Sequence, residues 1–298
     1  MFRGTFTALV TPFQNGTIDI QALEKLIEAQ VTAGIDGIVA VGTTGESPTL
    51  SRDEKEQIIR FAIERANKRC LVLAGTGSYA TEDAIAATQA AEKLGADGAL
   101  VVAPYYNKPS QEGLFRHFQA IAKATSLPLI LYNIPSRCGV DIGPETVARL
   151  QSDCSNVVSI KEASGSVDRV SELRARMPDD FTILSGDDAL TLPFMAVGAM
   201  GVVSVASNLL PREICQLVRA FLEGGKKDAE QLHRKLYWLF KDLFVEPNPV
   251  PVKMAMSWRG LIRSEVRLPL CEMTQVNQAR LKRTLEEFER ASDGGASE

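Results

Sequence analysis

The sequence predicts an α/β protein, a closed (β/α)8 TIM barrel with a small C-terminal helical extension. Short runs rich in β-branched residues recur about every 25–35 residues, with amphipathic segments between them, and this pattern favours parallel β/α units. Eight such runs occur, which is the number that a closed barrel needs. The length of 298 residues suits one barrel of about 250 residues with an appendage.

The strands and the first helices can be placed individually. The predicted strands are Gly4–Val10, Gly37–Val41, Cys70–Ala74, Gly98–Ala103, Leu127–Tyr132, Val157–Lys161, Phe181–Ser185 and Gly201–Ala206. A turn is expected at Phe13–Gly16. Three helix-start signals follow the early strands, namely Asp19 before Ile20, the capping box Ser51–Glu54, and Thr81–Ala84.

Beyond the eighth strand the chain shows only helical periodicity, up to about Arg290. The expected helices are Arg212–Glu223, Lys226–Phe244 and Thr274–Glu289. One helix closes the barrel and the others exceed what a barrel needs. We therefore expect a barrel over residues 1–224 and a helical extension over residues 225–298. The last residues, Ser292–Glu298, are small and polar and are expected to be disordered.

Composition narrows the class of partner. Apolar residues make up 45% of the chain, the net charge is −4, and no block of Lys or Arg suggests a nucleic-acid or membrane surface, so small solutes are the expected partners. The five cysteines are far apart and form no C-x-x-C, which fits a reducing compartment. No stretch of about 20 apolar residues and no signal peptide is recognisable, so we expect a cytoplasmic protein. His117 and His233 lack metal-ligand spacing, so no metal is expected.

Lys161 is the most unusual residue of the predicted barrel, because it lies at the C-terminal end of the apolar run Asn156–Ser164. Alternation along a strand directs its neighbour Glu162 to the opposite face, so Glu162 is not its ion-pair partner. An unpaired buried lysine loses its proton, at a cost of about 4–5 kcal/mol for neutrality at pH 7. A neutral amine attacks carbonyls and forms Schiff bases. The alternative is that Lys161 ends a frayed strand and extends to water.

The residues that follow the other strands are also polar, and active sites of such barrels lie at these strand ends. The polar strand ends are Gly42–Ser47, Gly75–Ser78, Pro104–Lys108, Tyr132–Arg137, Lys161-Glu162 and Gly186–Asp188. This clustering favours Lys161 as a nucleophile. Gly42–Glu46 could hold a small carboxylate through its amides and hydroxyls, or could be an ordinary polar turn. Arg137 could be a solvated loop charge, or could bind a carboxylate with two hydrogen bonds.

Tyrosines also occur at these ends. Tyr105, Tyr106 and Tyr132 could be aromatic packing, or a phenol beside Lys161 could transfer protons. Gly75–Ala80 matches a G-x-G-x-x-A dinucleotide fingerprint, but Asp97 precedes the next strand instead of ending it, which argues against this motif. Gly42–Ser47 lacks the Gly-Lys-[Ser/Thr] of a P-loop. No cofactor is expected.

Four motifs together resemble the dihydrodipicolinate synthase family of the N-acetylneuraminate lyase and class I aldolase superfamily. They are Gly42–Glu46, Tyr132–Arg137, Lys161-Glu162 and Asn248–Lys253, in the family's order, and the resemblance covers approximately Phe2 to Phe288. It implies an imine-forming lyase, in which Lys161 bonds to pyruvate and the resulting enamine attacks L-aspartate-4-semialdehyde. The cyclised product serves lysine and diaminopimelate biosynthesis.

The resemblance also implies roles for individual residues. Thr43 and Thr44 would hold the pyruvate carboxylate, and Thr44, Tyr132 and Tyr106 would form a proton relay. Tyr132 would be the general acid and base. Tyr106 would enter from a neighbouring subunit, so a homodimer would be the minimum active unit, commonly paired into a homotetramer.

The substrate pocket is implied in the same way. Arg137 would bind the semialdehyde carboxylate, while Gly186 and Val203 would line the pyruvate pocket. Another pyruvate-dependent aldolase of the superfamily, of the keto-sugar-acid or N-acetylneuraminate lyase type, is the alternative, and Arg137 favours the semialdehyde. A non-catalytic metabolite-binding barrel is a further alternative, which the presence of both a nucleophile and a relay disfavours.

A regulatory site is implied at the positions where related enzymes bind L-lysine. These candidate positions are Ser47, Pro48, Arg52, Lys55, Tyr79, Asp83 and Tyr105. Ser47, Asp83 and Tyr105 fit lysine binding, whereas the other four differ from the lysine-inhibited members. The cations among them would repel the ε-ammonium of L-lysine, so weak or absent feedback inhibition is expected.

Overall fold

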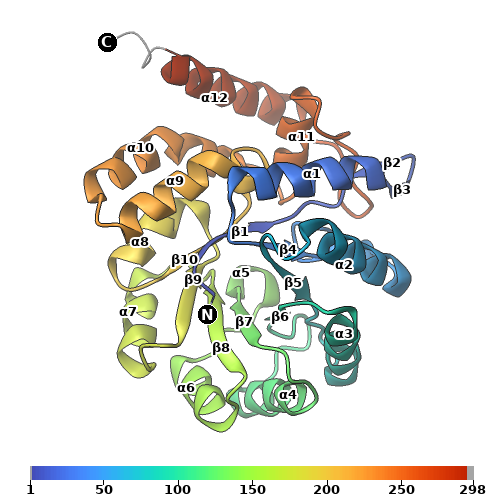
Figure 1. The fold of residues 1–298 in the computed structure, drawn as a ribbon, viewed down its shortest axis with the longest axis vertical. Coiled ribbons are helices and arrows are strands. Elements are labelled where there is room, and N and C mark those ends of the chain that lie inside the picture. The colour runs from blue at the N-terminus through green and yellow to red at the C-terminus, as the bar shows by residue number, and fades with distance from the viewer. Residues whose placement is uncertain (1, 294–298) are drawn as a thin grey trace.

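A computed structural model describes residues 2–293 and confirms the (β/α)8 barrel. Eight parallel strands close in the order β1-β10-β9-β8-β7-β6-β5-β4, and helices surround them (Figure 1). The strands are β1 Gly4–Ala8, β4 Gly37–Ala40, β5 Leu71–Gly75, β6 Gly98–Val102, β7 Leu129–Asn133, β8 Val157–Glu162, β9 Thr182–Ser185 and β10 Gly201–Ser204. Every predicted run overlaps one of these strands, and the bounds differ by no more than two residues.

The first three helices of the barrel begin where the predicted signals stand. The barrel helices are α1 Ile20–Ala33, α2 Arg52–Ala66, α3 Thr81–Leu94, α4 Gln111–Lys123, α5 Pro135–Cys138, α6 Pro144–Asp153, α7 Val167–Arg176, α8 Thr191–Ala196 and α9 Pro211–Leu222, with three 3-10 turns, η1 Ser47–Thr49, η2 Asp188–Leu190 and η3 Ala206–Asn208. Asp19 caps α1 by accepting a hydrogen bond from Ala22 N at 3.0 Å. Ser51 and Glu54 form both halves of the capping box of α2. The hairpin of β2 (Phe13–Gln14) and β3 (Thr17–Ile18) contains the predicted turn.

Three further helices form the C-terminal extension, which lies at the top of Figure 1. They are α10 Lys226–Asp242, α11 Val250–Trp258 and α12 Gln275–Asp293, of which α11 was not among the expected helices. Helix α12 packs against α10 and α11. It continues through Ser292 and Asp293, so the predicted disordered tail is wrong for these two residues, and residues 294–298 lie outside the described residues. The division at residue 224 stays a prediction.

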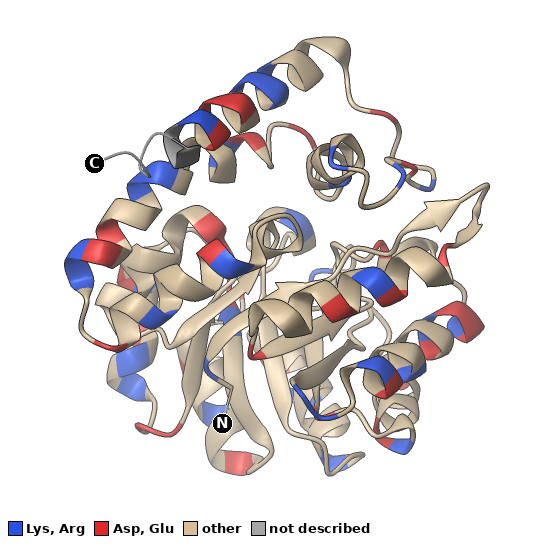
Figure 2. Ribbon diagram, turned by 45° about the horizontal axis from the view of Figure 1, so that its top comes forward, with Lys and Arg blue, Asp and Glu red and all other residues tan. Residues whose placement is uncertain are grey.

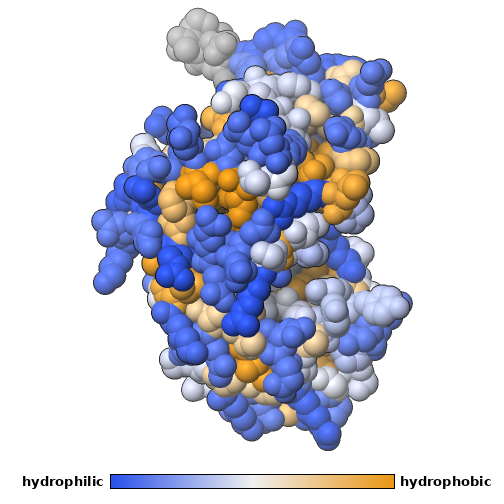
Figure 3. Space-filling model, turned by 90° about the vertical axis from the view of Figure 1, so that its right-hand side faces the viewer, coloured by the Kyte–Doolittle hydropathy of each residue, from blue (hydrophilic) through white to orange (hydrophobic). Residues whose placement is uncertain are grey.

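The surface is mostly hydrophilic. Lys and Arg alternate with Asp and Glu along the outer helices, and the strands carry few charges (Figure 2). The face that holds α1, α2 and α3 shows small hydrophobic patches among hydrophilic residues (Figure 3). No helix within residues 2–293 is both long and apolar enough to cross a membrane.

A buried ion pair joins the extension to the barrel. Lys253 of α11 lies 2.6 Å from Glu46, which follows β4, and both side chains are fully buried. The second carboxylate oxygen of Glu46 accepts a hydrogen bond from Arg267 N at 2.9 Å. Arg267 in turn pairs with Glu54 of α2 at 2.6 Å. The extension is therefore fixed at the C-terminal end of strand β4.

Removal of the lysine from this pair should destabilise the whole fold. Lys253→Met leaves the Glu46 carboxylate buried without its counter-ion, and we expect a loss of about 3–5 kcal/mol in the free energy of unfolding measured with urea. Arg176→Ala is the control, because it breaks an exposed pair with Glu172 on α7 and should cost less than about 0.5 kcal/mol. Equal losses in the two variants would contradict the prediction.

Candidate active site

Lys161 is held inside the barrel, between Tyr132 of β7 and Leu184 of β9. Its side chain is only 6% exposed, so the alternative of a frayed strand end is wrong. Burial lowers the pKa of Lys161 to about 7, while the negative charge of Asp188 raises this pKa and the positive charge of Arg137 lowers it. A substantial fraction of this amine is therefore neutral at physiological pH, as a nucleophile requires.

Glu162 points away from Lys161, as the strand alternation predicts. Its carboxylate is fully buried and pairs with Arg169 at 2.7 Å. It also accepts hydrogen bonds from the amide of Asn133 at 3.1 Å and from Ser164 N at 2.7 Å. These partners satisfy Glu162 on the outer side of the strand, so the amine of Lys161 has no carboxylate neighbour on its own strand.

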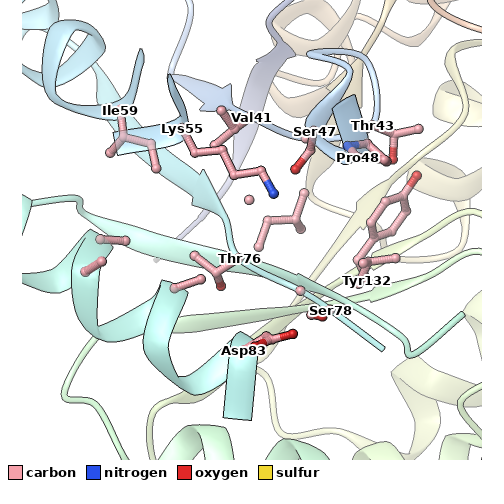
Figure 4. A pocket seen from close by; sticks show the side chains of 18 of the residues that line it. Val41, Thr43, Ser47, Pro48, Lys55, Ile59, Thr76, Ser78, Asp83 and Tyr132 are labelled. Carbon is pink, nitrogen blue, oxygen red and sulfur yellow. The ribbon is translucent and has the colours of Figure 1, made fainter. Parts of the chain in front are cut away.

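Tyr132 lies beside the amine, with the Lys161 Nζ 4.0 Å from the centre of its ring. Burial raises the pKa of Tyr132 to about 12, against the lowering influence of Arg137 and of a hydrogen bond with Thr43. The Tyr132 hydroxyl points toward Thr43 in Figure 4. At neutral pH the phenol is thus protonated and able to donate a proton next to Lys161.

Thr44 has a different partner. Its hydroxyl oxygen accepts a hydrogen bond from the side-chain amide of Asn248 at 3.0 Å. The main-chain oxygen of Asn248 accepts a hydrogen bond from Arg137 Nη2 at 3.4 Å. Asn248 thus connects two predicted site residues. The sequence analysis included it in a family motif but gave it no role.

Gly186 follows β9 and lies close to the Lys161 side chain, whereas Val203 lies on β10, two strands away from β8. A methyl group at Gly186 would lie 3.0 Å from Lys161 Cε and 2.7 Å from Ala163 Cβ, so only glycine fits without displacing the lysine side chain. Val203 lies on β10 and is buried. Both predicted pocket residues therefore belong to strands or strand ends that enclose Lys161.

Asp188 is a site residue that the sequence analysis did not single out. Its buried carboxylate accepts hydrogen bonds from Ser204 Oγ at 2.5 Å and from Val205 N and Ala206 N at 3.0 Å each. Burial raises the pKa of Asp188 to about 6, against the lowering effect of these donors. The available signal was the polar end of strand β9, which the sequence shows as Gly186–Asp188.

A cavity of about 500 Å³ opens next to these residues and extends between α2 and α3 (Figure 4). Thr43, Tyr132 and Arg137 line one part of it. Six of the predicted lysine-site residues also line it, namely Ser47, Pro48, Arg52, Lys55, Asp83 and Tyr105. The seventh, Tyr79, packs edge-on against Tyr105 with ring centres 5.3 Å apart.

Lys55 projects into the middle of this cavity (Figure 4). Burial lowers the pKa of Lys55, and the nearby Asp83 carboxylate opposes the change. A basic side chain of the protein therefore shares the cavity with the acidic group that could attract the ε-ammonium of a bound lysine.

Tyr106 does not enter the site of its own chain. Its side chain is 91% exposed. The backbone at Tyr106 has a φ of +72°, a left-handed conformation that few non-glycine residues adopt. The described residues thus place Lys161, Tyr132, Thr43 and Thr44 at one end of the barrel and leave Tyr106 on the surface.

Metal ligation has no evident place in this arrangement. Within residues 2–293, no three His, Cys, Asp or Glu side chains are grouped so that they could hold a metal ion. The chemistry that the site can perform with its own residues is nucleophilic attack by Lys161, with proton transfer by Tyr132.

The model of the dihydrodipicolinate synthetase family matches residues 1–288. The chain belongs to this family. The 4-hydroxy-tetrahydrodipicolinate synthase of Persephonella marina is 56% identical over 289 residues, which cover 97% of this chain and 99% of the relative. Family membership agrees with the observed barrel and with the buried lysine at its C-terminal end.

Solved structures of the family share the same fold. The 4-hydroxy-tetrahydrodipicolinate synthase of the thermoacidophilic methanotroph Methylacidiphilum fumariolicum SolV is 58% identical, with a TM-score of 0.96 and coverage of 97% of both chains. A second relative, 40% identical with a TM-score of 0.95 and 97% coverage of both chains, is described as a monomeric dihydrodipicolinate synthase variant. A relative that keeps this barrel is therefore described as a monomer.

The rate of imine formation at Lys161 should depend on pH near neutrality. Only the neutral amine attacks a carbonyl, and the pKa of Lys161 is about 7. We therefore expect the rate with a 2-keto acid to fall about tenfold per pH unit below about pH 6.5 and to level off above about pH 8. Borohydride trapping at a series of pH values measures this rate. A rate that stays constant down to about pH 5 would contradict the assigned nucleophile.

Proposed function

We propose that the chain is a 4-hydroxy-tetrahydrodipicolinate synthase that condenses pyruvate with L-aspartate-4-semialdehyde. The observation that carries the proposal is a buried lysine with a pKa of about 7 that contacts a protonated tyrosine at the C-terminal end of a (β/α)8 barrel. Close relatives bear this enzyme's name over nearly the whole chain. The reaction is an imine-forming lyase reaction of lysine and diaminopimelate biosynthesis.

The first half of the reaction uses Lys161. Its neutral amine attacks the keto carbon of pyruvate, water leaves, and a protonated imine forms. Loss of a methyl proton converts this imine to an enamine. Thr43 and Thr44 hold the pyruvate carboxylate, and Gly186 carries no side chain that would displace Lys161 Cε from the position in which the imine forms.

The second half uses the phenol. The enamine carbon attacks the aldehyde carbon of the second substrate, and Tyr132 donates a proton to the oxygen that becomes a hydroxyl. Arg137 binds the carboxylate of the semialdehyde. The substrate's own amine then displaces Lys161 on cyclisation, which releases the heterocycle and restores the free lysine.

Trapping with sodium borohydride tests the imine directly. We expect pyruvate and borohydride together to add a stable group to Lys161, identified by peptide mass spectrometry, and the untreated enzyme to turn over aspartate semialdehyde. Lys253 is an internal control, because it is also buried but is paired with Glu46. An adduct on another lysine, or no adduct, would overturn the mechanism. An adduct without semialdehyde turnover would overturn the substrate.

The active unit that we propose is a homodimer in which Tyr106 enters the neighbouring site, with a homotetramer formed from two dimers. Support comes from the 91% exposure of Tyr106, whose hydroxyl is free to reach another chain. In this arrangement Tyr106 joins Thr44 and Tyr132 in a proton relay.

A mixed dimer tests whether Tyr106 crosses between chains. We expect Tyr106→Phe and Lys161→Ala each to be nearly inactive alone, and their co-refolded mixture to regain about a quarter of wild-type activity. Half of the dimers are then hybrids, and each hybrid holds one complete site. If Tyr106 acts within its own chain, both sites of the hybrid are defective and mixing restores nothing.

Feedback control by L-lysine should be weak. Lys55 and Asp83 line the same cavity, and the charge of Lys55 opposes the entry of a second ammonium group. We expect turnover to stay unchanged with L-lysine at about millimolar concentration and to become more sensitive in Lys55→Met, which removes the repulsion. A sharp fall in wild-type turnover on addition of L-lysine would contradict this prediction.

We also propose a cytoplasmic location. The five cysteines, Cys70, Cys138, Cys154, Cys215 and Cys271, are all free thiols. Unpaired thiols are the usual state in a reducing compartment.

A further inference from the structure

Asn248 reaches the site from the C-terminal extension, just before α11. Its side chain is 5% exposed, and its Nδ2 donates a hydrogen bond to Thr44 Oγ1 at 3.0 Å. Its Oδ1 has no hydrogen-bond partner among residues 2–293. The two residues are 204 positions apart in the sequence, so this contact depends on the docking of the extension.

The chemistry of the two groups determines the direction of the bond. The NH2 group of an asparagine can only donate, whereas a threonine hydroxyl has one proton and two lone pairs. Thr44 therefore accepts from Asn248, and its own proton is directed elsewhere. We propose that Asn248 is a positioning residue that sets the direction in which Thr44 passes a proton.

The proposal rests on the proposed function, in which Thr44 connects two tyrosines. A hydroxyl in such a relay accepts a proton from one phenol and donates its own proton to the other group. If the Thr44 proton were directed to Asn248, it would be lost from the relay. The donor group of Asn248 prevents this, because it occupies one lone pair of Thr44 and leaves the Thr44 proton and the other lone pair free.

The surroundings hold Asn248 firmly. Its main-chain oxygen accepts a hydrogen bond from Arg137. In the next turn, Lys253 N donates to Pro249 O, and the Lys253 side chain pairs with Glu46, two residues after Thr44. The segment from Asn248 to Lys253 and the segment from Thr44 to Glu46 are therefore joined at two points, and the amide cannot move away independently.

Two substitutions at Asn248 distinguish the effect of its hydrogen-bond donor from the effect of its side-chain packing. Asn248→Ala removes the donor, and Asn248→Asp keeps the shape but replaces the donor with an acceptor. Ser257→Ala is the matched control, because Ser257 lies on α11, which follows Asn248, and within residues 2–293 its hydroxyl bonds only to Met254. Each protein is assayed for kcat, for KM with aspartate semialdehyde, for borohydride trapping at Lys161 and for thermal unfolding.

We expect Asn248→Ala to lower kcat about tenfold with little change in KM, because the main-chain bond to Arg137 is retained. Asn248→Asp should be slower than Asn248→Ala at about pH 8, since its carboxylate takes the Thr44 proton. The kcat of Asn248→Asp divided by the kcat of Asn248→Ala should rise as the pH falls, because the protonated carboxyl group of the aspartate again offers a donor to Thr44. If the negative charge at position 248 acted instead by raising the pKa of Lys161, Asn248→Asp would lose more activity than Asn248→Ala as the pH falls. The ratio would then fall with the pH.

The outcomes are distinct. The inference is overturned if Asn248→Ala keeps the wild-type kcat. It is also overturned if Asn248→Asp is at least as fast as Asn248→Ala at every pH, or if the loss of kcat follows the loss of unfolding temperature alone. If Asn248→Ala does not fold, Asn248→Asp compared with the Ser257→Ala control decides by the same pH dependence. Failure of the wild type itself to trap pyruvate or to turn over the semialdehyde would instead overturn the proposed function.

Discussion

The buried ion pair between Glu46 and Lys253 is the interaction on which the arrangement of the site depends. Two charges without solvent contact stabilise a fold only when further hydrogen bonds satisfy them, and Arg267 N supplies one to Glu46. Such pairs contribute specificity of docking more than net stability. The specificity matters here because the helix that carries Lys253 begins next to Asn248, which contacts Thr44 and Arg137. This pair thus fixes the position of the extension relative to the ends of strands β4 and β7.

The two buried lysines show how the same physical cost produces different chemistry. Burial lowers the pKa of both Lys253 and Lys161. At Lys253 the adjacent Glu46 carboxylate opposes this change, and the residue serves as a cation in a structural pair. At Lys161 the negative charge of Asp188, whose carboxylate bonds to Ser204, Val205 and Ala206, offsets only part of the effect of burial. The pKa of Lys161 is therefore about 7, and much of the amine is neutral. The presence or absence of a contacting carboxylate therefore separates an anchor from a nucleophile.

Much of this could be predicted from the sequence, because strands, caps and strand-end residues are local features. The period of the runs placed the eight barrel strands, β1 and β4 to β10, and alternation along β8 correctly directed Glu162 away from Lys161. Helix α11 was missed because it is short, follows Pro249 directly and contains Pro251. The contacts of Asn248 with Thr44 and of Tyr132 with Thr43 depend on how distant segments dock, and no local pattern encodes that. The helical residues at the end of α12 were missed because small polar composition alone does not exclude a helix.

The site residues are divided between strands of the barrel and segments outside the sheet. Lys161 and Tyr132 are on adjacent hydrogen-bonded strands, so the proposed nucleophile and the proposed proton donor are fixed relative to one another. Arg137 is on the short helix α5 and Asn248 is in the extension, outside the sheet. Changes in these outer segments can alter recognition of the second substrate while the strands keep the imine chemistry constant. Shared strand chemistry with variable outer segments is how one barrel can serve several aldolase reactions.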